Sequence, residues 1–147
     1  MVLDLVLKGI FSAAFLASIL RISTPIILPA LGGLVSELTG VMNIALEGIM
    51  LVAAFTGVVV SAYTQNLWVG VLAGPLSGVL ISAFLAYFHI YLETDIFLAG
   101  IAINIMAAGG TIFLLYVLTG DKGNSSSLVS LSVPELHIPL LQDHLLL

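Results

Sequence analysis

The chain has 147 residues, of which 61% are hydrophobic and only 7% are charged. A soluble domain carries about 25% charged residues, so three basic and eight acidic side chains exclude a soluble enzyme, a nucleic-acid-binding domain and a disordered chain. The absence of cysteine excludes disulfides and thiolate chemistry. Composition therefore predicts an integral membrane protein, and at about 20 residues per span the length allows four or five spanning helices.

The N-terminal part is apolar but interrupted. Residues 5–20 predict a first span that ends at Arg21. The next apolar stretch, 24–36, is too short to cross a bilayer alone and is predicted to be a partial helix. Residues that favour a helix break lie in and after this stretch: Pro25, Pro29, Gly32, Gly33 and Gly40.

Residues 37–43 predict a break before the next helix. In one interpretation, the stretch near residues 24–47 is a discontinuous or re-entrant helix, whose non-helical backbone is buried in protein or lines a cavity. In the other, the break is a plain loop between two full helices, the first of them over 9–31. The two interpretations give opposite membrane orientations, and three basic residues do not decide between them.

Three long apolar segments follow, at 44–63, 67–91 and 97–119. The uncharged run from 48 to 92 is too long for one span, and a polar turn around Gln65 and Asn66 divides it. Residues 121–147 predict an extramembrane loop, in which His137 and His144 are interpreted as loop residues and not as metal ligands. The expected fold is an all-α polytopic transmembrane helical bundle.

Small residues recur every four positions in the segment 67–91, which places them on one helix face. They are Gly70, Gly74, Gly78, Ser82 and Ala86. A weaker ladder of Ala53, Gly57 and Ser61 lies in the preceding segment, so we expect these two helices to pack closely through their small residues. The sequence contains no nucleotide-binding loop, zinc motif or serine-hydrolase motif, and no enzymatic activity is predicted.

Three polar residues in apolar surroundings are candidates for function. Glu47 lies at the start of the segment 44–63, where it either serves function as an intramembrane acid or stabilises the helix dipole at the interface. Asn43 can cap the same helix. Asn104, near the middle of 97–119, either contacts a polar substrate or bonds a neighbouring helix.

Two motifs carry a resemblance to a known family. The stretch Gly40-Val-Met-Asn-Ile-Ala-Leu-Glu-Gly48 and the later Ala99-Gly-Ile-Ala-Ile-Asn104 are similar to motifs of ABC importer permeases. These permeases form the branched-chain amino acid, ribose and nucleoside superfamily, and the residues are most like its nucleoside and simple-sugar branch. The segment 134–141 also resembles an external loop of that branch.

The resemblance implies a permease subunit in a bacterial inner membrane, with Asn43, Glu47 and Asn104 beside the central pathway. Its partners would be a second permease subunit, ATPase subunits that use ATP, and an extracytoplasmic substrate-binding lipoprotein. The chain itself would bind no cofactor. Family members are longer, and only their N-terminal half is matched, so we expect a truncated or frameshifted reading frame, a split subunit or a fragment of a longer chain. The alternative hypothesis is an autonomous small structural or channel-like membrane protein that associates through its small-residue helix faces.

Overall fold

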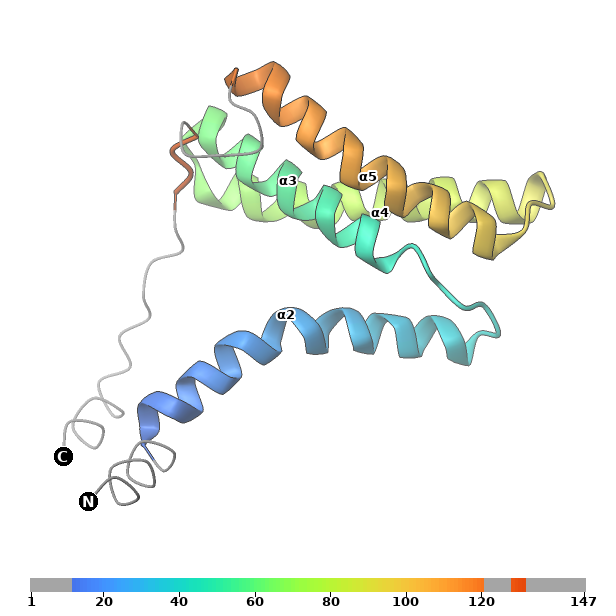
Figure 1. The fold of residues 1–147 in the computed structure, drawn as a ribbon, viewed down its shortest axis with the longest axis horizontal. Coiled ribbons are helices and arrows are strands. Elements are labelled where there is room, and N and C mark those ends of the chain that lie inside the picture. Colours follow the sequence, from blue (N-terminus) through green and yellow to red (C-terminus); the bar gives the residue numbers. More distant parts are fainter. Residues whose placement is uncertain (1–11, 121–127, 132–147) are drawn as a thin grey trace. The chain divides into compact units, whose positions relative to one another are not determined.

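The computed structural model describes residues 12–120 and 128–131. Within these residues it contains no strand and four helices (Figure 1): α2 (Ala13–Leu38), α3 (Leu46–Thr64), α4 (Leu67–Tyr91) and α5 (Ile96–Thr119). All four are long and apolar enough to cross a membrane. Even α3, the shortest with 19 residues, extends about 28 Å at ~1.5 Å per residue. The predicted fold class, an all-α polytopic membrane bundle, is confirmed.

The first described helix differs from its prediction. α2 continues through Arg21, where we expected the first span to end, and joins the stretch 24–36 to the residues before it. The charge of Arg21 and the proline at position 25 predicted the end of a first spanning helix here. Proline removes one backbone N–H from the helical ladder, and membrane helices tolerate that loss. One or two missing bonds therefore do not end a helix of 26 residues.

The break itself lies where the sequence predicts it, but fewer residues form it. Pro25, Pro29, Gly32 and Gly33 all lie inside α2, so their prediction as break residues is wrong. Only Gly40 lies outside a helix, with φ at +82°, in the left-handed region that favours glycine. The helices on both sides of the break are each long enough to cross a membrane, as expected of a loop between two full helices.

The small-residue ladder of α4 lies against α3. A Cβ added at Gly70 would lie 2.6 Å from the Ser61 Cβ and 2.8 Å from the Gly57 carbonyl oxygen. One added at Gly74 would lie 3.0 Å from the carbonyl oxygen of Ala53. Real Cβ contacts are not this short, so the two backbones approach closely only because glycine occupies these positions.

The other three members of the ladder are less buried the closer they lie to the C-terminal end of α4. Gly78 is buried near Ile49 and Ala53 of α3. Ser82 is half-buried, and Ala86 is exposed. The close contact between α3 and α4, which we call the close seam, therefore involves only the first three members of the predicted ladder, Gly70, Gly74 and Gly78.

A small apolar core forms where the start of α3, the second half of α4 and the start of α5 meet. Its centre consists of Ala45, Leu85 and Ile103, which are 0%, 5% and 9% exposed. Most other large apolar side chains of the described residues are exposed. That pattern is expected when the surrounding solvent is lipid, because lipid tails are as apolar as leucine.

The close seam predicts opposite effects of two glycine-to-alanine changes. Gly70→Ala forces α3 and α4 apart and should lower the free energy of unfolding by about 1–3 kcal/mol. Gly109→Ala on α5 meets no atom within 4 Å, so alanine's higher helix propensity should leave stability unchanged or raise it by up to ~1 kcal/mol. Thermal unfolding in detergent measures both. Equal melting temperatures for the two variants would contradict the seam.

Candidate functional site

The start of α3 is capped differently from the starts of α4 and α5. Asn66 caps α4 and Asp95 caps α5, each through a side-chain oxygen that accepts from backbone N–H groups of the first turn. The residue at the equivalent position of α3 is Ala45, whose methyl group accepts nothing. Gly48 in the first turn is buried, so its N–H group needs an acceptor from the protein.

Asn104 of α5 provides this acceptor from another helix. Its Oδ1 accepts a hydrogen bond from the backbone N–H of Gly48 at 2.7 Å, in the first turn of α3. Its Nδ2 donates to the carbonyl oxygen of Ile44 at 2.9 Å. Both ends of the amide are therefore bonded to the backbone around the α3 start, and we call this pair of bonds the Asn104 clasp.

Two glycines let the helices approach closely enough for the clasp. A Cβ added at Gly48 would lie 2.8 Å from Asn104 Oδ1 and 3.0 Å from the Ile103 carbonyl oxygen. One added at Gly100 would lie 3.1 Å from the Ile44 Cβ. From the sequence, Gly48 and Gly100 were only parts of the two motifs, and no packing role was predicted for them, because neither forms a ladder with its neighbours.

Asn43 contacts the same helix start from the preceding loop. Its Oδ1 accepts from the backbone N–H of Ala45 at 3.0 Å, a short-range bond typical of asparagine in turns. Asn43 thus orders the turn that precedes α3. The N–H group in the first turn of α3, which Asn43 was expected to cap, is bonded by Asn104. The structure brings these two predicted residues together on one helix terminus.

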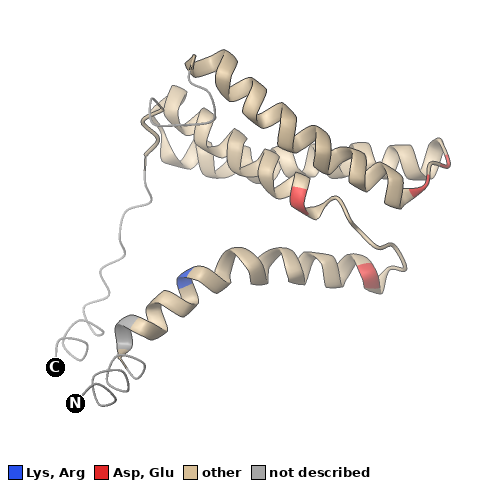
Figure 2. Cartoon of the chain, viewed as in Figure 1, with Lys and Arg blue, Asp and Glu red and all other residues tan. Residues whose placement is uncertain are grey.

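Glu47 lies in the first turn of α3, and its side chain is exposed. Arg21 is the single lysine or arginine in the described part of the chain (Figure 2). The N-terminal end of a helix dipole favours a carboxylate. Position alone therefore stabilises Glu47, and its side chain stays available to groups outside the described residues.

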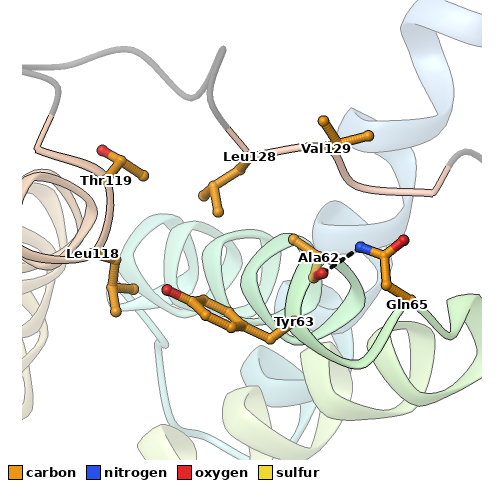
Figure 3. Close-up of a pocket in the computed structure, with 7 residues that line it drawn as sticks. All are labelled: Ala62, Tyr63, Gln65, Leu118, Thr119, Leu128 and Val129. Carbon is orange, nitrogen blue, oxygen red and sulfur yellow. Dashed lines mark hydrogen bonds between the residues drawn. The ribbon is translucent and has the colours of Figure 1, made fainter.

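A cavity of larger volume than the one near Asn43 lies away from these residues. It measures about 400 Å³ and lies beside the last residues of α3 and α5, where Tyr63, Leu118 and Leu128 line it (Figure 3). The Gln65 amide at its edge donates to the Ala62 carbonyl. Among the described residues no cluster of histidine, aspartate and glutamate could hold a metal ion. His137 and His144 lie outside the described residues, as does most of the predicted loop 121–147.

Comparison with known families identifies the architecture. Residues 15–141 match the family described as branched-chain amino acid transport system, permease component. The chain belongs to this family. Apart from the first two residues of α2, its described helices, the break before α3 and the clasp all lie within the matched range, so they are features of a permease component.

Three curated relatives agree with this assignment. The guanosine ABC transporter permease protein NupQ of Bacillus subtilis is 39% identical over 104 residues, which are 67% of this chain and 33% of the relative. The nucleoside ABC transporter permease protein NupC of Lactococcus lactis is 37% identical over 107 residues, 69% of this chain and 34% of the relative. A proposed glucose ABC transporter permease protein of Haloferax volcanii is 36% identical over 103 residues, 70% and 31% respectively.

The matched region is about a third of the length of these relatives. No solved structure gives a significant match to the chain.

The clasp predicts a graded response at position 104. Asn104→Leu leaves the Gly48 N–H and the Ile44 carbonyl without partners and should lower the free energy of unfolding by about 1–3 kcal/mol. Asn104→Asp keeps an acceptor for the N–H group, but it places a carboxylate oxygen against the Ile44 carbonyl and adds a charge inside a membrane-spanning helix, so its cost should be larger. Thermal unfolding in detergent should rank wild type first, leucine second and aspartate last.

A matched control is Ser77→Ala on α4, which removes a hydroxyl bonded only to its own helix, at the Gly74 carbonyl. It should change stability by less than about 0.5 kcal/mol. A leucine variant as stable as this control would show that the clasp adds nothing to the packing.

Proposed function

We propose that the chain forms part of the membrane-spanning permease of an ATP-driven importer for nucleosides or simple sugars. The observation that carries the proposal is the agreement between the family and the relatives. The family match covers residues 15–141, and the matched relatives are named for guanosine, nucleoside and glucose transport. The four helices long enough to span a membrane are consistent with this role.

The partners follow from the same proposal. ATP is used by separate ATPase subunits, a second permease subunit completes the pathway, and an extracytoplasmic binding lipoprotein delivers the substrate. The chain binds no cofactor itself, and it resides in a bacterial cytoplasmic membrane. The absence of a nucleotide-binding loop from the sequence supports the separate ATPase.

Asn104 and Glu47 have different roles in this proposal. Asn104 acts as a positioning residue, because both groups of its amide are already bonded to the backbone around the α3 start. Glu47 is exposed in the turn that the clasp holds, so its carboxylate is the group that faces the pathway or a partner. An acid inside a membrane-spanning segment is costly unless it has such a role.

The contacts of the small-residue ladder argue against the alternative of an autonomous protein that associates through this face. Gly70, Gly74 and Gly78 are buried against α3 of the same chain. A face that is covered within the chain does not join two copies. The ladder is therefore explained as packing of α4 against α3 within one permease chain.

Uptake in cells tests the proposal. Deletion of the gene in its source organism should abolish ATP-dependent uptake of radiolabelled guanosine or glucose, and the wild-type gene should restore it. Glu47→Gln should lower the initial rate by about tenfold, equivalent to ~1.4 kcal/mol. The control is Glu93→Gln, an exposed acid in the turn between α4 and α5, which should leave the rate unchanged. If deletion affects the uptake of neither solute, the proposal is wrong.

A further inference from the structure

A cavity of about 280 Å³ lies between the last turn of α2 with the loop that follows it, the second half of α4 and the first residue of α5. Five polar side chains from two of these segments line it, and we call it the acceptor pocket: Ser36, Thr39, Asn43, Ser82 and His89. Apolar side chains, Leu85 and Ile96 among them, form the rest of its wall. Sequence reasoning connected Asn43 with a pathway but did not associate it with His89 or Ser82.

The hydroxyl groups of this pocket have already donated their hydrogens. Ser36 donates to the Val41 carbonyl at 2.7 Å, Thr39 to the Ser36 carbonyl at 2.6 Å, and Ser82 to the Gly78 carbonyl at 2.9 Å. A hydroxyl has one donor and two acceptor positions. Each oxygen therefore retains lone pairs that accept from a ligand, and none retains a hydrogen to give.

The histidine adds another acceptor. His89 Nδ1 lies 3.1 Å from the carbonyl oxygen of Thr94. A carbonyl only accepts, so this contact places the proton of the neutral ring on Nδ1 and leaves Nε2 as an acceptor. Asn43 differs, because its Oδ1 is bonded to the Ala45 N–H while its Nδ2 has no partner among the described residues. The pocket thus presents several acceptors and one donor group.

These properties select a class of ligand. No charged side chain lines the pocket, so phosphorylated solutes and zwitterionic amino acids have no counter-charge there. A ligand that matches several acceptors carries several O–H donors, and its non-polar face packs on Leu85 and Ile96. The volume is slightly below the 300 Å³ or so at which pockets for drug-sized ligands begin, which suits a single sugar ring.

The pocket also extends along α4, away from the end of that helix. Ser82 precedes the last residue of α4, Tyr91, by nine positions, or about 14 Å along the helix axis at ~1.5 Å per residue. His89, by contrast, lies in the last turn of the same helix. A solute that contacts both residues would therefore lie between the end of α4 and a position further along the same helix, as expected of a solute that enters a pathway.

We propose that the acceptor pocket binds the sugar ring of the transported solute, through hydroxyl groups that donate to Ser82 and His89. This inference rests on the proposed function and deepens it. The shared chemistry is a neutral ring with neighbouring hydroxyls, which a nucleoside supplies through its ribose and a simple sugar supplies directly.

Equilibrium binding of radiolabelled guanosine and, separately, glucose to the purified membrane complex that contains this chain tests the assignment. Ser82→Ala removes one acceptor. His89→Asn keeps a donor for the Thr94 carbonyl and removes Nε2. Each should raise the dissociation constant of the transported solute about 2- to 10-fold, the range for one hydrogen bond. Ala86→Leu, which fills the pocket, should raise it roughly tenfold or more.

Matched controls lie on the same helix outside the pocket. Ser77→Ala removes a hydroxyl bonded to the Gly74 carbonyl, and Ala83→Leu enlarges an exposed residue. Both should bind like wild type. Deoxy analogues of guanosine separate contact from structural damage. The hydroxyl that donates to Ser82 should matter to the wild type and lose its effect in Ser82→Ala, because a removed contact cannot be lost twice.

The outcomes distinguish the two proposals. If the wild type transports a solute but binds it with the same affinity in the pocket variants, or does not bind it in the isolated complex, the pocket assignment is overturned and the proposed function stands. If the wild type transports neither guanosine nor glucose, the proposed function fails. Weaker binding in the pocket variants alone, together with the deoxy result, supports the pocket.

Discussion

The start of α3 is the constraint on which much of the described structure depends. A buried N–H group without a partner costs about 1–3 kcal/mol, and the residue at the cap position, Ala45, has no side chain that could prevent this cost. The acceptor comes from Asn104, 56 residues further along the chain. The beginning of α3 is therefore completed only when α5 packs against it, and a local feature of one helix becomes a tertiary contact.

The clasp places strict demands on its surroundings. The amide reaches the α3 backbone only because Gly48 and Gly100 have no side chains between the helices. The same end of the molecule contains the core residues Ala45, Leu85 and Ile103, which bring the second half of α4 to this point. Glycines on the other half of α4 hold it against α3 along the rest of its length. In lipid the hydrophobic effect does not drive helices together, so their association depends on close contact between backbones.

Hydrophobic length and local turn signals predicted most of the fold. The predicted segments 44–63, 67–91 and 97–119 differ from α3, α4 and α5 by at most two residues at any end. The first helix was divided wrongly, because Arg21 and Pro25 predict a boundary, whereas one arginine and two prolines do not end α2 and membrane helices tolerate proline. The break was predicted because Glu37, Thr39, Gly40 and Asn43 interrupt the apolar run, and the structure adds that Gly40 has a positive φ, which glycine favours.

The candidate site was predicted only in part, for a different physical reason. Asn43, Glu47 and Asn104 attract attention as polar residues in apolar segments, but the sequence does not say what an amide bonds. The partners of Asn104 are backbone groups at Ile44 and Gly48, which any sequence would provide. Likewise, His89 and Ser82 lie near the turn before α3 only in three dimensions. Pairings between distant backbone and side-chain groups have no sequence period and are not visible before the fold is known.

Hydrogen-bond capacity then separates the structural polar residues from those available to a ligand. An asparagine amide has two donor hydrogens and one oxygen, and in Asn104 both the oxygen and the nitrogen bond the same helix start, so it acts as structure. In Asn43 only the oxygen is used, and in His89 only one ring nitrogen. In a chain with few charged residues, such unused groups are the main means of recognising a neutral polar solute. Under the proposed function, recognition of the solute falls to the residues around the break, next to the helix start that the clasp holds.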